Sequence, residues 1–206
     1  MLRLYTAPGT IGLACEIALE EARAPYEAVR LNFRENEQRG EAYLAVNPKA
    51  RVPALATDRG IITEALAILG YVARTFPEAG LAPTADAFGM AEVEAFMSYL
   101  CSWAHPAAAH RHRGYRWADD PAAIAEMRRK APEVFGEAMR LIDADLFKGP
   151  WAMGEAYTVC DPYLYVVAGW LPRDGLDLAA FPRLADHFVR MGARPAVQSV
   201  LARVAG

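Results

Sequence analysis

The sequence predicts an α/β amino-terminal domain followed by an all-α carboxy-terminal domain, on the strength of three observations. Up to residue 76, short alternating segments typical of strands are interleaved with segments of helical periodicity. A cluster of proline and glycine follows, and beyond it every apolar pattern has the period of a helix. We therefore expect a first domain over residues 1–76, a linker over 77–84 and a helical domain over 85–206.

The composition indicates a globular protein and argues against several classes of partner and site. The chain has 206 residues, of which 54% are hydrophobic and 23% charged, as in ordinary globular proteins. Its net charge of −3 provides no basic field for nucleic acid or anionic lipid, so we expect neither partner. Cys15, Cys101 and Cys160 are too far apart for a disulfide framework or a zinc site. With no apolar run of roughly 18 residues, a cytoplasmic protein is expected.

The first domain begins with a strand over residues 2–6, a loop at Ala7-Pro8-Gly9 and a helix over 11–22. A second strand over 26–31 follows, and strand, helix, strand implies a right-handed parallel crossover. After a polar stretch and a short helix near 41–46, two short strands flank a turn at Asp58-Arg59-Gly60. Thr63 suits the cap of the next helix. This order of elements is that of a thioredoxin-like domain.

The second domain should be a helical bundle. Its first helix, over residues 85–103, has apolar strips on two sides, which predicts packing on the first domain and against a second subunit. Residues 105–120 form the least regular stretch, an extended loop or a broken helix over the site. Helices over 122–146 and 160–171 follow, the second with Thr158 and Asp161 in a capping box, and two further helices close the chain.

The stretch from Asn47 to Glu64 has the features of a binding edge. A helix that opens directly after a strand leaves free amide donors at residues 64–66, which suit a carboxylate. Because Glu64 carries its own carboxylate, the ligand should also bring an ammonium group, as an α-amino acid does. A cis Val52–Pro53 bond would expose the Val52 amide and carbonyl for pairing with a peptide. The alternative is an ordinary hairpin followed by a capped helix.

The pattern Asn-Pro-Lys-x-x-Val-Pro-Ala-Leu, followed by Thr-Glu-x-x-Ala-Ile, resembles the glutathione site of the cytosolic glutathione transferase superfamily. The resemblance extends from Leu4-Tyr5-Thr6-Ala7-Pro8-Gly9 to Thr158-Val159-Cys160-Asp161-Pro162-Tyr163 and to Arg194-Pro195. It is strongest for the bacterial, beta-like branch. It implies the glutathione transferase fold, glutathione as co-substrate, no metal, and a homodimer.

The resemblance also implies a glutathione site. The binding residues would be Thr10, Arg51, Val52, Pro53, Glu64 and Ala65. Glu35 stands where a lysine would meet the glycyl carboxylate of glutathione, which leaves Arg34 or Arg51 for that task.

Such a protein must activate the thiol of glutathione, because a free thiol with a pKa near 8.5 is mostly protonated at neutral pH. Ile11 replaces the cysteine of the beta-like branch, which leaves Thr10 as the first candidate donor and Tyr5 as the second. His105 is a third catalytic candidate, facing the electrophile. The alternatives are structural: Thr10 as a helix cap, Tyr5 as a core aromatic and His105 as a helix-end residue bonded to backbone.

The second-substrate pocket implied by the resemblance would be lined by Tyr99, Trp103, His105, Tyr115 and Trp117. The expected function is conjugation of glutathione to small hydrophobic electrophiles. Two alternatives remain: a glutathione-dependent isomerase, dehalogenase or lyase, and a non-enzymatic binding or scaffold protein. The histidines at 105, 110 and 112 match no common metal-ligand spacing, so no metal is expected there.

Overall fold

A mixed four-stranded sheet forms the centre of the amino-terminal part in the computed structural model, which describes residues 1–205. Its strands are β1 (Leu2–Thr6), β2 (Tyr26–Arg30), β3 (Ala54–Thr57) and β4 (Gly60–Thr63), in the order β2-β1-β3-β4. The pair β1 and β2 is parallel, as the crossover pattern predicts, whereas β3 runs antiparallel to both β1 and β4. This is the thioredoxin-like arrangement expected from the sequence.

Three helices accompany this sheet in the described residues: α1 (Gly12–Glu21), α2 (Glu41–Leu44) and α3 (Ala65–Thr75). α1 and α3 pack against each other and against the sheet. A Cβ atom at Gly12 would lie 2.2 Å from the Thr6 hydroxyl oxygen, so only glycine lets α1 begin this close to β1. The prediction that Thr63 caps α3 is wrong, because Thr63 ends β4 and Glu64 precedes the helix.

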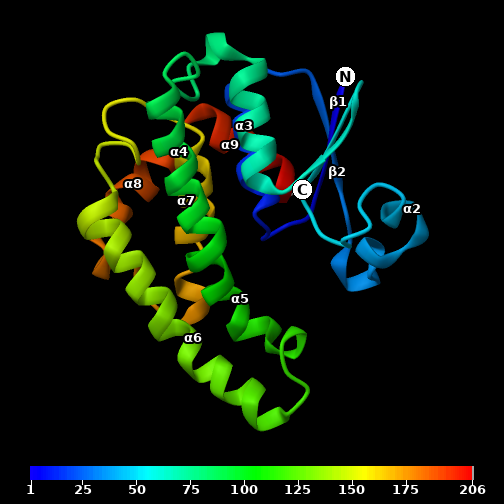
Figure 1. Cartoon of the computed structure of the whole chain (residues 1–206), viewed down its shortest axis with the longest axis vertical. Coiled ribbons are helices and arrows are strands. Elements are labelled where there is room, and N and C mark those ends of the chain that lie inside the picture. Colours follow the sequence, from blue (N-terminus) through cyan, green and yellow to red (C-terminus); the bar gives the residue numbers. More distant parts are fainter. Residues whose placement is uncertain (206) are drawn as a thin grey trace.

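The carboxy-terminal part is helical, as predicted, and lies beside the sheet (Figure 1). Its helices are α4 (Ala87–Tyr99), α5 (His105–Arg113), α6 (Pro121–Leu141), α7 (Cys160–Ala168), α8 (Pro182–Gly192) and α9 (Pro195–Ala205). α9 returns to pack on α1, so the chain ends next to the first part. None of the helices in residues 1–205 is both long and apolar enough to cross a membrane.

The segment that follows α4 is a broken helix and not an extended loop. A π-helical turn over Leu100–Ala104 joins α4 to α5, and a 3₁₀ turn over Gly114–Arg116 follows α5. Pro106 lies in the first turn of α5, where a helix tolerates proline. The chain direction therefore continues from α4 into α5, but the π turn shifts the phase of the side chains.

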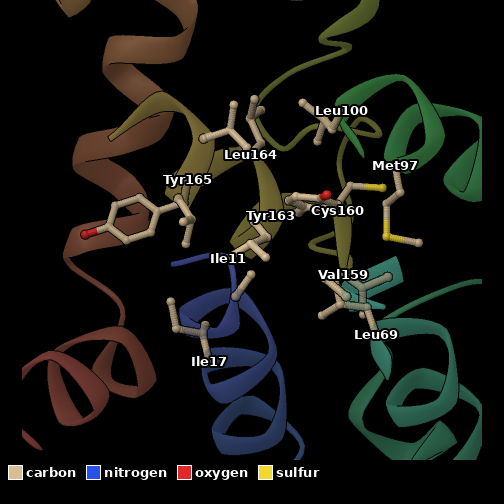
Figure 2. Close-up of a cluster of buried hydrophobic side chains, with 14 of the residues drawn as sticks. Ile11, Ile17, Leu69, Met97, Leu100, Val159, Cys160, Tyr163, Leu164 and Tyr165 are labelled. Atoms are coloured by element: carbon tan, nitrogen blue, oxygen red, sulfur yellow. The ribbon is translucent and has the colours of Figure 1, made fainter. Parts of the chain in front are cut away.

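The hydrophobic core is continuous between the two parts of the chain. Figure 2 shows Ile17 of α1, Leu69 of α3, Met97 of α4 and Leu164 of α7 converging on one cluster, and all four are fully buried. α7 lies at its centre, which agrees with the prediction from its apolar sequence. We propose that the domain boundary lies in residues 77–84, although the core crosses it.

The start of α7 has the predicted capping box. The Thr158 amide donates to Asp161 Oδ2 over 2.7 Å, and the Cys160 amide donates to Thr158 Oγ1 over 3.3 Å. Asp161 Oδ1 also accepts from the Ala152 amide over 2.7 Å, and His187 Nε2 lies 3.0 Å away. The buried Asp161 carboxylate therefore joins α7, α8 and the preceding loop.

Candidate active site

A cavity of about 680 Å³ opens between the two parts of the chain. From the amino-terminal part it is lined by the start of α1, the turns before α2, the segment around Val52–Pro53 and the start of α3. From the helical part it is lined by α5, the 3₁₀ turn after it and the end of α7. In Figure 1 the segment from Phe33 to α2 (blue) and α5 (green) belong to these two sides.

The segment before Pro53 presents unpaired backbone to this cavity. The Val52–Pro53 bond is cis, and within residues 1–205 neither the amide nor the carbonyl of Val52 has a hydrogen-bond partner. The preceding carbonyl, that of Arg51, accepts from the Tyr43 hydroxyl over 2.6 Å and from Asn47 Nδ2 over 2.7 Å. These two bonds fix the loop, so Val52 is held as a short free edge for an extended ligand.

The start of α3 lies next to that edge. Glu64 precedes the helix with φ 73° and ψ 124°, a conformation that non-glycine residues rarely adopt. Its exposed carboxylate accepts from Lys49 Nζ over 2.6 Å. Ala65 and Leu66 line the same cavity, and the first amides of a helix have no intrahelical acceptor. This end of the cavity therefore offers a carboxylate and free amide donors together.

Thr10 lies at the start of α1 and lines the cavity with Gly9 and Ile11. Its hydroxyl donates to the Ala7 carbonyl over 2.7 Å and accepts from the Gly12 amide over 3.3 Å. Thr10 is therefore a half-buried hydroxyl at the positive end of a ten-residue helix. The apolar Ile11 beside it carries no thiol.

His105 stands across the cavity at the start of α5. Its ring meets that of Trp170 edge to face, with centroids 4.7 Å apart. Burial, followed by the positive charges of Arg113, Arg173 and Arg51, lowers the pKa of His105 to about 4. The imidazole is therefore neutral at pH 7, and one ring nitrogen can donate a hydrogen bond while the other accepts one.

Comparison with known proteins identifies the family to which this chain belongs. Residues 1–74 match the model of the glutathione S-transferase N-terminal domain. A glutathione S-transferase from Xanthomonas campestris is 30% identical over 200 residues, which is 97% of each chain. The chain belongs to the cytosolic glutathione transferase superfamily.

Two further relatives illustrate the range of this superfamily. The crystal structure of a glutathione transferase homolog from Sulfitobacter with bound glutathione matches with a TM-score of 0.95 and 43% identity over 98% of each chain. A maleylpyruvate isomerase from Ralstonia is 28% identical over 170 residues, 81% of this chain and 80% of that protein. The family resemblance and the glutathione transferase fold expected from the sequence are thus confirmed.

Six of the residues expected to bind glutathione in this transferase-family protein line this cavity. These are Thr10, Arg51, Val52, Pro53, Glu64 and Ala65. Arg34, one of two candidates for the glycyl carboxylate, does not line it, whereas Arg39 does. Tyr5 also lies outside: it pairs with Ala54 in the sheet, and its ring lies 5.7 Å from that of Tyr43. Of the two candidate thiol-activating hydroxyls, Thr10 and Tyr5, only Thr10 therefore lines the cavity.

The expected second-substrate residues divide into two groups. His105, Tyr115 and Trp117 line the cavity, but Tyr99 and Trp103 do not. Tyr99 and Trp103 are four residues apart and share one helical face, while His105 lies about 200° further round than Trp103. That face lies on the side of the helix opposite His105, and the Trp103 residue is 52% exposed, so a place for Tyr99 and Trp103 in the second-substrate pocket stays a prediction.

The remaining histidines have structural partners. His110 stacks on Trp117 with ring centroids 4.1 Å apart, and its Nδ1 lies 2.6 Å from the Pro106 carbonyl oxygen. His112 Nε2 lies 2.9 Å from the buried Asp174 carboxylate. These contacts fix α5 against the turn that follows it and against the 3₁₀ turn Pro172–Asp174.

The sequence did not predict the charge of the cavity. Its arginines are Arg39, Arg51, Arg113, Arg116 and Arg173, and Glu64 is the single acidic residue among the described lining residues. A signal was present in the alternating basic residues 111–116, but nothing local connects Arg39 or Arg173 to them. The tertiary fold alone brings these arginines together.

Proposed function

We propose that this glutathione transferase-family protein conjugates glutathione to small electrophiles with an apolar body. The observation that carries the proposal is that one cavity unites the Val52 edge, the start of α3 and the Thr10 hydroxyl with the aromatic residues of the helical part. The first three features match the parts of a γ-glutamyl peptide with a thiol. The aromatic side supplies the surface for a second substrate.

Each end of glutathione would have its own partner in this site. The backbone of Val52 would pair with the cysteinyl unit as an added strand. The γ-glutamyl carboxylate would accept from the Ala65 and Leu66 amides, and its ammonium would meet Glu64. Arg51 or Arg39 would bind the glycyl carboxylate. The thiol would then lie at Thr10.

Thr10 would stabilise the thiolate by exchanging its hydrogen-bond acceptor. Its hydroxyl now donates to the neutral Ala7 carbonyl. A bond to an anionic acceptor is roughly twice as strong as a neutral one, so turning the donor to a thiolate is favourable by about 1 kcal/mol or more. The partial positive charge of the α1 amino terminus acts in the same direction.

The reaction is a nucleophilic substitution. The thiolate sulfur forms a bond to the electrophilic carbon, and the leaving group departs with its electron pair. The thiol proton passes to solvent, directly or through the neutral His105. The protein contributes the orientation of the two reactants and a lowered thiol pKa.

Calorimetric titration of the full-length protein with glutathione tests the binding site. Saturable binding that is lost or weakened at least tenfold in Glu64→Gln is expected. The matched control is Glu94→Gln, since Glu94 is also exposed and ion-paired, with Arg74 over 2.6 Å, but lies outside the cavity. Equal affinities in the three proteins would refute the site, and binding without turnover of any electrophile would favour a non-enzymatic role.

A glutathione-dependent isomerase is the second candidate, and the similarity to a maleylpyruvate isomerase favours it. The same thiolate would add to the substrate and leave again after rotation about the attacked bond. Glutathione would then be regenerated. Thiol titration during turnover separates the two activities, because conjugation consumes one thiol per product and isomerisation consumes none.

We also propose a homodimer. One face of α4 and of the π turn that follows it carries apolar residues that are exposed in the single chain, among them Phe88 and Trp103. A second copy covering this face would explain their exposure. Sedimentation or light scattering measures the mass directly.

A further inference from the structure

We propose that the second substrate of this site carries a carboxylate, bound by Arg113 with Arg116 and Arg173 from the helical part of the cavity lining. This inference rests on the proposed transferase function and specifies its substrate class. It changes the expected electrophile from a purely apolar molecule to a small anion with an apolar body.

Arg113 is a cavity-lining arginine without a partner in the described residues. It is half-buried and lines the cavity, yet within residues 1–205 it has no ion pair and no side-chain hydrogen bond. Burial lowers its pKa, and the nearby guanidinium groups of Arg116, Arg173 and Arg51 lower it further. Positive charges close to a half-buried guanidinium group destabilise the free protein unless a bound anion compensates for them. The arrangement is what an anionic ligand requires.

Arg173 is held in position from two sides. Its guanidinium lies over the Trp170 ring, 5.3 Å from the centroid, and its Nε lies 3.5 Å from Asp174 Oδ1. Asp174 Oδ1 is also approached by His112 and by Arg111, so two arginines and a histidine share one carboxylate. The remaining nitrogens of Arg173 are therefore available on a pre-oriented, stacked side chain.

Glutathione does not account for this charge. Its γ-glutamyl carboxylate is matched by the amides at the start of α3, and its glycyl carboxylate needs one arginine from the amino-terminal side, Arg39 or Arg51. Arg113, Arg116 and Arg173 all come from the helical part, where the electrophile would lie. A carboxylate on the second substrate would meet them without competing with glutathione.

The same side of the cavity has room for an aromatic or unsaturated body. Tyr115, Trp117 and Trp170 line it beside the arginines. A flat substrate could stack on these rings, place its carboxylate among the guanidinium groups and point its electrophilic carbon towards Thr10. Planar guanidinium groups bind carboxylates with two parallel hydrogen bonds, which orients as well as attracts.

Two electrophiles that differ mainly in charge test this inference: 4-chloro-3-nitrobenzoate and 4-chloro-3-nitrobenzamide. In both, the glutathione sulfur bonds to the chlorine-bearing carbon, chloride leaves with the electron pair, and the thiol proton passes to solvent. The measured quantity is kcat/KM divided by the uncatalysed rate constant. We expect the wild-type protein to favour the benzoate by about tenfold or more, the effect of a charge-assisted hydrogen bond.

Arg113→Gln should reduce this benzoate-to-benzamide ratio about tenfold, and Arg113→Lys should restore part of it because the charge returns without the planar fork. Arg116→Gln, at an exposed position, provides a second variant should the half-buried site fail to fold. Arg128→Gln is the matched control, since Arg128 is exposed on α6 outside the cavity. Its ratio should equal that of the wild type.

The outcomes separate the inference from the proposed function. Conjugation of both compounds with the same ratio in wild type, Arg113→Gln and Arg116→Gln would overturn the inference and leave the transferase proposal standing. Binding of the two synthetic glutathione conjugates gives an independent measurement that needs no turnover. Equal affinities for the carboxylate and carboxamide conjugates would overturn the inference even in an inactive protein.

Discussion

The hydroxyl of Thr10 donates a hydrogen bond to the carbonyl oxygen of Ala7 over 2.7 Å. The only hydroxyl group at the start of α1 that lines the described cavity is thus already oriented by the loop before the helix. A glutathione thiolate would compete with that carbonyl for one proton. This competition makes the role of Thr10 measurable.

Thr10→Ala should lower kcat at least tenfold with little change in glutathione affinity, because the hydroxyl acts on the thiolate and not on the peptide backbone. The pKa of the bound thiol, measured from thiolate absorbance against pH, should rise. Thr10→Ser keeps the hydroxyl and should keep most of the rate. An unchanged thiol pKa in Thr10→Ala would remove Thr10 from the mechanism.

The lowered pKa of His105 has a consequence for stability against pH. The unfolded chain protonates this histidine near pH 6.5, whereas the folded chain does so only near pH 4. Between these values the unfolded state binds more protons, so the free energy of unfolding falls as the pH is lowered from 6.5 to 4. The full loss is roughly 3 kcal/mol, and above pH 6.5 the contribution is constant.

Urea unfolding of the wild type and of His105→Gln at pH 7.5 and 4.5 measures this effect. The wild type should lose roughly 2 to 3 kcal/mol more than the variant over that interval. A nuclear magnetic resonance titration of the imidazole reports the pKa directly. A value near 6.5, or equal losses in the two proteins, would contradict the burial of a neutral histidine.

The glutathione side of the site was predictable because its residues are close in sequence and joined by a hairpin. Val52, Glu64 and Ala65 are brought together by the local pairing of β3 with β4, and turn and strand signals report that pairing. Thr10 follows from the first strand and helix. Local patterns therefore predicted the binding edge at Val52, Glu64 and Ala65, whereas the role of Thr10 was expected from the family resemblance and stays a prediction.

The electrophile side could not be predicted in the same way. Spacing places Trp103 and His105 on opposite sides of the helix, but only the packing of the π turn and of α5 decides which side faces the cavity. Arg113 and Arg173 lie on different elements, and only the packing of α5 beside the end of α7 places them together. Charge in a cavity is a property of the tertiary fold.

The backbone conformation at Glu64 predicts that glycine at this position stabilises the protein relative to alanine. Its φ of 73° and ψ of 124° cost a non-glycine residue about 1 to 3 kcal/mol. Glu64→Ala and Glu64→Gly both remove the exposed ion pair with Lys49, so their difference isolates the backbone. Glu64→Gly should unfold about 2 to 6 °C above Glu64→Ala in a thermal melt. A higher melting temperature for the alanine variant would show that this backbone is not strained.

Asp161 should be among the most sensitive positions for stability. It is fully buried and accepts hydrogen bonds from the amides of Ala152 and Thr158, with His187 Nε2 3.0 Å away. Asp161→Ala leaves these buried donors without an acceptor at the centre of the helical part, so we expect a loss of about 3 to 5 kcal/mol in the free energy of unfolding.

The matched control for Asp161→Ala is Asp177→Ala. Asp177 also accepts from a backbone amide, that of Ala179 over 2.9 Å, but it is exposed and water can replace it. Its loss should cost about 1 kcal/mol. Thermal melts should therefore place Asp161→Ala at least about 8 °C below the wild type and Asp177→Ala within about 4 °C. Similar losses in the two variants would mean that the Asp161 network is not a main determinant of stability, because burial is the chief difference between the two aspartates.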